Sequence, residues 1–490
     1  MMKKTRNLVS IILILCLITT LLTACGEKQV ENHGLDSDAP TTITIWHYYN
    51  GVQQENFEKL LLQFNETVGR EMGIIVKGYS KESINDLASA VLASLREDPG
   101  AETAPDMFAA YAGTAFSADA LGRVADLSAY FTDEELSEYV EGYLEEGNID
   151  GTGSLKIFPI AKSTEVLMLN QTDWQTFADA ENVSIDDLST WESLAQVAEK
   201  YYNYTDSLTP DTADDGKAFF GRDSIANYML VGAKQLGLEF CTLENGNVSV
   251  HLDEDVVRQL WDNYYVPYVK GYYFSSQARF RSDDTQTGSI IAMACSTTGA
   301  MYFPATVTLD DDHSYPIESL TLPIPNFTDT DPYVVQQGAG MVVVKSDETK
   351  EYACSVFLKW FTEEERSIDF SVSSGYMPVK KTANDSKAFA AAFEAEPSIL
   401  QSVMEVAASE VNNYQLYAPK PYDTAEDVRS FLDRYIQETA QEAHDTAAER
   451  ISNGEAKNTV LADYLSDAAF QTWYEGFVSG LQAAAKAQEG

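Results

Sequence analysis

Aromatic side chains gather where the first predicted strand of this chain ends. Trp46, His47 and Tyr48 directly follow the alternating residues Ile43, Thr44 and Ile45. An aromatic ring offers a flat apolar face, and Trp and Tyr add a polar group at its edge. Such side chains suit a molecule with C–H faces and a rim of hydroxyls, such as a sugar. The alternative interpretation is that they pack between strand and helix.

Two further groups of residues follow predicted strands. Tyr111 lies just beyond the strand at residues 105–108, and Ser296 and Thr297 follow the apolar strand at residues 290–293. Open α/β sheets bind ligands at the carboxyl ends of their strands. Clustered hydroxyls before Gly299 suit an oxygen-rich ligand, or an anion at a helix N-terminus. They suit a plain helix cap equally well.

Motifs of catalysis are missing from the sequence. It contains no G-x-S-x-G elbow, no Walker loop and no H-E-x-x-H. The loop at residues 211–216 half resembles a calcium loop, but Arg222 stands where its twelfth position requires Glu. The five histidines are scattered. We therefore predict a protein that is not an enzyme and that has no cofactor or metal, with a secreted glycosidase as a remote alternative.

The periodicity of apolar residues predicts an α/β fold. Strands at residues 43–45 and 74–76 alternate with amphipathic helices at 57–68 and 84–95. This rhythm is typical of a parallel sheet with crossover helices. The pattern returns later in strands at residues 166–169, 290–293 and 341–344 and in a helix at 347–361. From about residue 383 onward the chain is predicted to be almost entirely helical.

The N-terminus has the three parts of a secretory signal. Lys3, Lys4 and Arg6 precede an apolar run from residue 8 to 22, which is too short to span a membrane. The run ends in Leu-Thr-Ala-Cys, which resembles a lipobox and predicts acylation of Cys25. We expect a signal peptide at 1–24, a flexible tether at 25–40 and a lipid-anchored protein on the extracytoplasmic face of the cell membrane. The alternative is an ordinary signal peptide with a chance cysteine.

Length and charge narrow the choice of partners. A chain of 490 residues is too long for one compact core and favours two domains or lobes. Its formal net charge of −43 disfavours nucleic acid and anionic lipid headgroups as partners. Beyond Cys25 the odd number of cysteines and the lack of a CxxC pair argue against a disulfide framework.

Eight local motifs, in the same order, resemble the family 1 extracellular solute-binding proteins, the maltose-binding-protein-like class. They include the opening strand, a "G-x-(V/L)-x-D-L" turn and a "G-x-x-A-M" strand. The motifs occupy residues 43–47, 105–108, 121–127, 157–170, 288–293, 337–340, 357–362 and 375–379.

The resemblance implies a two-lobe, type II periplasmic-binding-protein-like fold with the ligand between the lobes. The lobes are expected at 41–162 plus 336–376 and at 163–335 plus 377–490. In addition to the residues named above, the resemblance brings five into the predicted site. Ser163, Thr164 and Glu165 lie at the first crossing, where they are expected to contact the ligand, form the hinge or cap a helix. Gly338 is expected to permit close approach of the backbone, and Tyr376 is expected to cover the ligand.

The resemblance also implies a monomer that delivers a sugar or polyol to the permease subunits of an ABC importer. Alternatives are a ligand-sensing partner of a membrane receptor and a binder of glycerol phosphate or glycerophosphodiesters. Some family members of the latter kind use a C-terminal arginine for phosphate. No arginine clearly matches here, because Lys420 is the nearest cation and Arg429 and Arg434 are expected on a helix surface.

Overall fold

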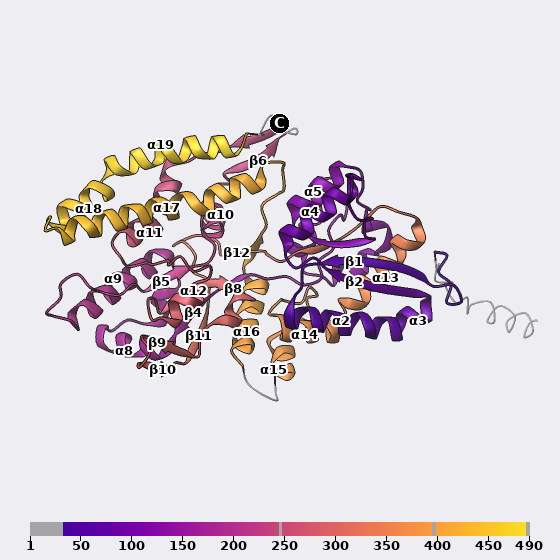
Figure 1. Ribbon diagram of the computed structural model, residues 1–490, viewed down its shortest axis with the longest axis horizontal. Coiled ribbons are helices and arrows are strands. Elements are labelled where there is room, and N and C mark those ends of the chain that lie inside the picture. The colour runs from indigo at the N-terminus through magenta and orange to yellow at the C-terminus, as the bar shows by residue number, and fades with distance from the viewer. Residues whose placement is uncertain (1–32, 245–246, 394–397, 487–490) are drawn as a thin grey trace, which may run out of the picture.

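The computed structural model describes residues 33–244, 247–393 and 398–486. It shows two α/β halves side by side, each built around its own sheet (Figure 1). The expected signal peptide, Cys25 and the first part of the tether lie outside the described residues. Within the described part of the chain, no helix is long and apolar enough to cross a membrane.

The first half contains a four-stranded sheet with one antiparallel edge. β1 pairs with β2 and β3 in parallel, as the periodicity predicts, and β13 joins from far along the chain in the antiparallel direction. The strands in spatial order are β13 (Gly340–Val343), β3 (Met107–Ala110), β1 (Thr41–His47) and β2 (Ile74–Ser80). The helices are α2 (Gly51–Glu66), α3 (Val68–Met72), α4 (Ile84–Leu95), α5 (Ala112–Ala120), η1 (Leu127–Tyr130), α6 (Asp133–Ser137), α7 (Glu141–Glu145), α13 (Glu348–Phe361) and α14 (Glu364–Ser374).

The second half is built on the sheet β11 (Ser319–Pro323), β4 (Glu165–Asn170), β8 (Ala292–Ser296) and β5 (Phe220–Arg222). β4 runs antiparallel to both of its neighbours, so the purely parallel arrangement that the recurring pattern suggested is wrong here. A continuous apolar run shows that a strand is buried but not which way it runs. β8 covers residues 292–296, whereas the predicted strand covered 290–293. Ser296 is therefore the last residue of the strand and not a loop residue.

Helices cover this second sheet, and three small two-stranded sheets lie around it. The helices are α8 (Gln171–Glu181), η2 (Ile185–Leu188), α9 (Trp191–Ser207), α10 (Ile225–Gln235), α11 (Glu254–Val269), α12 (Arg281–Gln286), η3 (Gly299–Tyr302), α15 (Ser386–Ala392), α16 (Ile399–Asn413), α17 (Ala425–Ser452), α18 (Lys457–Leu465) and α19 (Asp467–Ala484). The small sheets pair β6 (Cys241–Glu244) with β7 (Asn247–Val250), β9 (Thr306–Thr308) with β10 (Ser314–Pro316), and β12 (Tyr333–Val335) with β14 (Gln415–Tyr417).

The chain passes between the halves at segments that pair with one another. Ser163 bridges to Gln337, and Lys162 bridges to Met377. Lys162 is fully buried there, with its ammonium group paired with Glu146 and donating to the carbonyl oxygen of Gly338 at 2.8 Å. Gly338 has φ +88°, and a Cβ there would stand 2.9 Å from the carbonyl oxygen of Ala161. Only glycine therefore suits this crossing.

The described end of the expected tether lies against the first half. The carbonyl oxygen of His33 accepts a hydrogen bond from Thr349, its imidazole lies 2.6 Å from Glu348, and Leu35 is buried. Residues 33–40 are thus fixed onto α13 before the first strand begins.

Candidate ligand-binding site

Three tyrosines of the first half lie together on the side that faces the second half. The hydroxyl groups of Tyr48 and Tyr376 are 2.9 Å apart, and burial, together with the neighbouring phenol of Tyr111, raises the pKa of both. Tyr111 precedes α5 and keeps 47% of its surface accessible. Its pKa is nevertheless raised by desolvation, because protein surrounds the phenol closely. A side chain that contacts a ligand needs both properties, an accessible ring surface and protein atoms close around it.

Tyr111 has a charged neighbour on the second half. The Arg429 guanidinium, on the first turns of α17, opposes the desolvation that raises the pKa of Tyr111. α5 and the N-terminal end of α17 face each other across the upper part of the molecule (Figure 1). Arg429 is half-buried and donates to Asn227 at 2.8 Å and to Ser224 at 3.3 Å. Arg429 and Arg434 both lie on a helix, as predicted, but only Arg434 is exposed, whereas Arg429 is held by side chains about 200 residues away in the sequence.

Asn227 connects Arg429 to a buried ion pair. Its amide nitrogen donates to Glu165 at 2.9 Å, and the other carboxylate oxygen of Glu165 accepts from Arg222 at 2.7 Å. The side chains of Arg222 and Glu165 are 1% and 6% exposed. Glu165, the first residue of β4, is thus bound to protein groups at both oxygens. In this arrangement it orients Asn227 and, through it, Arg429.

The predicted hydroxyl residues mostly serve the crossing itself. Ser163 and Thr297 lie 2.8 Å apart through their hydroxyls, and Thr297 donates to the carbonyl oxygen of Gly375 at 2.7 Å. Ser296 accepts from the backbone N–H of Gly299, the first residue of η3, at 3.0 Å, but the N-cap position of η3 is Thr298, whose side chain makes no capping hydrogen bond. Thr164 is fully buried and its hydroxyl has no hydrogen-bond partner among the described residues.

Trp46 and His47 are the predicted site residues that lie deepest in the first half. Trp46 is 4% exposed and lies under the ammonium group of Lys81, which is 3.9 Å from the ring centroid. His47 is 1% exposed and packs against Phe57 and Tyr49. These are the positions of core residues, in line with the strand–helix packing interpretation. Their role as ligand contacts stays a prediction.

Sequence reasoning missed the side chains that the second half presents near the crossing. Tyr302, at the end of η3, is 76% exposed, and Phe280 is 47% exposed. Asp223 lies between them, since one oxygen accepts the backbone N–H of Arg281 at 2.8 Å and the other lies 3.6 Å from a Cβ built on Gly299. The signal available in the sequence was an aromatic residue close to a predicted turn. Tyr302 follows Gly299, and Phe280 directly precedes Arg281.

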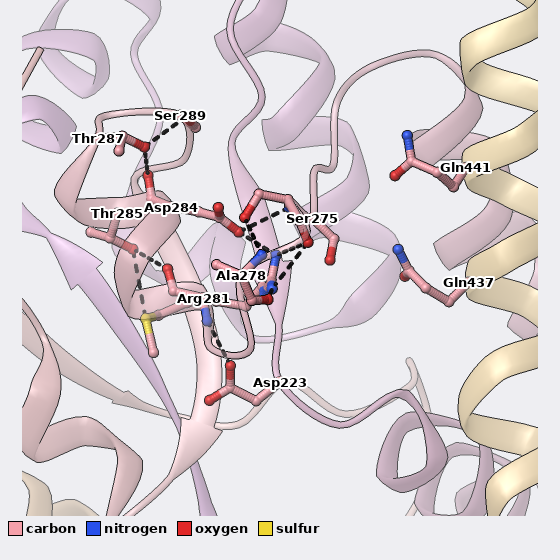
Figure 2. A network of polar contacts seen from close by, with 12 residues as sticks. Asp223, Ser275, Ala278, Arg281, Asp284, Thr285, Thr287, Ser289, Gln437 and Gln441 are labelled. Atoms are coloured by element: carbon pink, nitrogen blue, oxygen red, sulfur yellow. Dashed lines mark hydrogen bonds and ion pairs between the residues drawn. The ribbon is translucent and has the colours of Figure 1, made fainter.

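Asp223 is held in place by a wider polar network, which Figure 2 shows. Arg281 directs its guanidinium to Asp284 and to backbone carbonyls of residues 276 and 278, so its backbone N–H is fixed toward Asp223. Burial raises the pKa of Asp223 to about 6, and the Arg281 hydrogen bond opposes this. In its ionised form the carboxylate can accept hydroxyl hydrogen bonds.

The arrangement has the elements of a site for a polar small molecule. The first half supplies tyrosine rings and hydroxyls, and the second half supplies a fixed guanidinium, a carboxylate and exposed aromatic rings. Among the described residues, no group of three or more His, Cys, Asp and Glu side chains is arranged to hold a metal ion.

Two α/β lobes joined by paired crossings define the class of two-lobe periplasmic solute-binding proteins. The sequence model of the bacterial extracellular solute-binding protein family matches residues 59–397. The chain belongs to that family, which confirms the family and the fold class expected from the motifs. No curated protein matches the chain.

Solved structures similar to this chain share its architecture over nearly its whole length. The cyclic α-maltosyl-1,6-maltose binding protein of Arthrobacter globiformis is 18% identical, with a TM-score of 0.64, covering 91% of this chain and 100% of its own. UgpB of Mycobacterium tuberculosis, solved with glycerophosphocholine, is 17% identical with a TM-score of 0.63, covering 91% and 98%. The substrate-binding protein Lmo0181 of Listeria monocytogenes, solved with cycloalternan, is 13% identical with a TM-score of 0.57, covering 90% and 99%. At such identities the likeness shows the fold alone.

Proposed function

We propose that this chain is the substrate-binding protein of an ABC importer and that it captures a carbohydrate or polyol, unaltered, between its lobes. The observation that carries the proposal is Tyr111, an accessible ring closely surrounded by protein and opposite Arg429 of the other half. The ligands named for the Arthrobacter and Listeria proteins are oligosaccharides, which supports a carbohydrate.

The lobe boundaries belong to the same proposal. One hydrophobic core draws almost entirely on residues 35–161 and 339–379. The two other cores use residues 166–334, Met377 and residues 389–485. Apart from Val379 and Val411, which pack in the first core, this division supports lobes at 41–162 plus 336–376 and at 163–335 plus 377–490. Ligand that touches both lobes favours the closed form, because only that form completes its contacts.

The test is a thermal-shift panel of maltooligosaccharides, cyclic oligosaccharides and polyols. A ligand that binds only the folded chain raises its melting temperature. At a free ligand concentration of 100 times Kd, the free energy of unfolding rises by about 2.7 kcal/mol. We expect Tyr111→Ala to weaken binding of the best ligand about tenfold or more, since the aromatic face is lost. Tyr474→Ala, on α19, is the matched control and leaves affinity unchanged. Chromatography of the bound sugar should recover it intact, and turnover would contradict a pure binder.

A second candidate ligand is a glycerophosphodiester, and Arg429 favours it. A planar guanidinium already oriented by two hydrogen bonds suits a phosphate oxygen pair. UgpB, solved with glycerophosphocholine, is similar in fold to this chain. Arg429→Met distinguishes the candidates. It abolishes binding of glycerophosphocholine if the phosphate is the recognised group, whereas a sugar ligand loses less affinity through Arg429→Met than through Tyr111→Ala.

Lipid anchoring at Cys25 is the last part of the proposal. The lipobox-like Leu-Thr-Ala-Cys supports acyl chains on Cys25, which hold a protein on a membrane without spanning it. We expect Cys25→Ala to move the chain from the membrane fraction to the soluble fraction, measured by fractionation and immunoblot. Cys241→Ala, which keeps the lipobox, is the control and stays in the membrane fraction. Membrane association that persists in Cys25→Ala would reject the anchor.

A further inference from the structure

A cavity of about 620 Å³ lies in the second half, away from the crossing between the lobes. It is bounded by the end of α9, the residues after α11, the second half of α17 and the start of α18. Figure 1 places α9 and α18 at the end of the molecule farthest from the first half. Its volume is in the range of small-molecule sites, which are mostly about 300–1,000 Å³.

The walls of this cavity are partly aromatic and apolar. Tyr202 and Phe274 line it, together with Ile451 and Leu461. Gly271 forms part of one wall, and a Cβ there would stand 3.4 Å from both Tyr202 and His444. An aromatic or aliphatic body would bury its surface against these side chains.

Its charged lining reverses the balance of the chain. The chain has 76 acidic and 33 basic residues, yet the cavity is lined by Lys270, Lys457, His444 and only one carboxylate, Asp214. Asp214 already pairs with Lys457, and the pKa of Lys457 is raised despite its burial, so it stays charged. Lys270 lies 5.7 Å from the Tyr272 ring, a contact that needs none of its N–H donors.

We propose that this cavity is a second binding site and that it takes a small carboxylate with an aromatic or apolar body. The apolar body packs against the lining side chains, among them Phe274 and Tyr202, and the carboxylate accepts hydrogen bonds from Lys270 and from the remaining donors of Lys457. An ammonium group supplies three donors, so Lys457 keeps its bond to Asp214 while it binds the ligand.

The probe is 4-bromobenzoate, soaked into crystals of the mature chain and titrated in solution by calorimetry. We expect anomalous bromine density in this cavity and binding that Lys270→Met weakens about fivefold or more. Ala448→Trp, on the cavity side of α17, should abolish binding by filling the space. Glu449→Trp, the adjacent position that does not line the cavity, is the matched control and keeps full affinity.

Specific outcomes would overturn the site. Bromine density absent from the cavity at saturation contradicts it, as does equal binding of the neutral isostere 4-bromobenzamide. Binding that survives Ala448→Trp also contradicts it. Ala448→Trp should leave unchanged the melting-temperature shifts that the sugars cause. This result would separate the cavity from the interlobe site, so that each proposal can be tested without the other.

Discussion

Arg222→Met will lower the free energy of unfolding by about 3–5 kcal/mol, the range for breaking one side of a buried ion pair. The substitution leaves the carboxylate of Glu165 buried with only Asn227 as a partner. It also removes the guanidinium that lies 5.3 Å from the Trp191 ring centroid. Urea-induced unfolding followed by tryptophan fluorescence measures the loss.

The double variant Arg222→Met/Glu165→Met separates the ion pair from simple packing. Removing both charges leaves no uncompensated ion, so the double variant is expected to be more stable than the single one. A double variant that is as unstable as the single variant, or more so, would show that packing and not charge explains the loss. Arg258→Met is the matched control, because Arg258 also stacks on a tryptophan but is about one-third exposed. Arg258→Met should lower the free energy of unfolding by about 1 kcal/mol or less.

The ion pair also shows which parts of the site the sequence predicted. Apolar periodicity located the helices and strands of the first half, because spacing of three, four or two residues depends on local geometry. Glu165 and Arg222 are 57 residues apart, and Asn227 and Arg429 are 202 apart. Nothing local marks such pairs, so Glu165 was predicted as a ligand or hinge residue and Arg429 as a surface residue.

The rule that ligands bind at strand ends located an edge of the sheet but not the side chains exposed there. Tyr48 and Tyr111 lie at that edge with accessible surface, whereas Trp46 and His47 are covered by Lys81 and by α2. Short strands were missed for a related reason. β14 has three residues, too few for a pattern of alternation, and it exists because β12 offers a partner 82 residues earlier.

Stability should fall between about pH 7.5 and pH 4 because of His47. Burial lowers the pKa of His47 from 6.5 to about 4, with Glu58 opposing the shift. The unfolded chain binds a proton at this histidine near pH 6.5, whereas the folded chain binds it only near pH 4. In that window the unfolded state holds more protons, so acidification favours unfolding. The contribution is about 2 kcal/mol at pH 5 and about 3 kcal/mol at pH 4.

His47→Phe tests this directly, because phenylalanine fills the ring position between Phe57 and Tyr49 without a proton to bind. The difference in unfolding free energy between wild type and variant, measured by urea titration at pH 7.5 and pH 5, should change by about 2 kcal/mol. Parallel profiles for wild type and His47→Phe would mean that His47 has the same pKa in the folded and the unfolded chain, which contradicts the prediction.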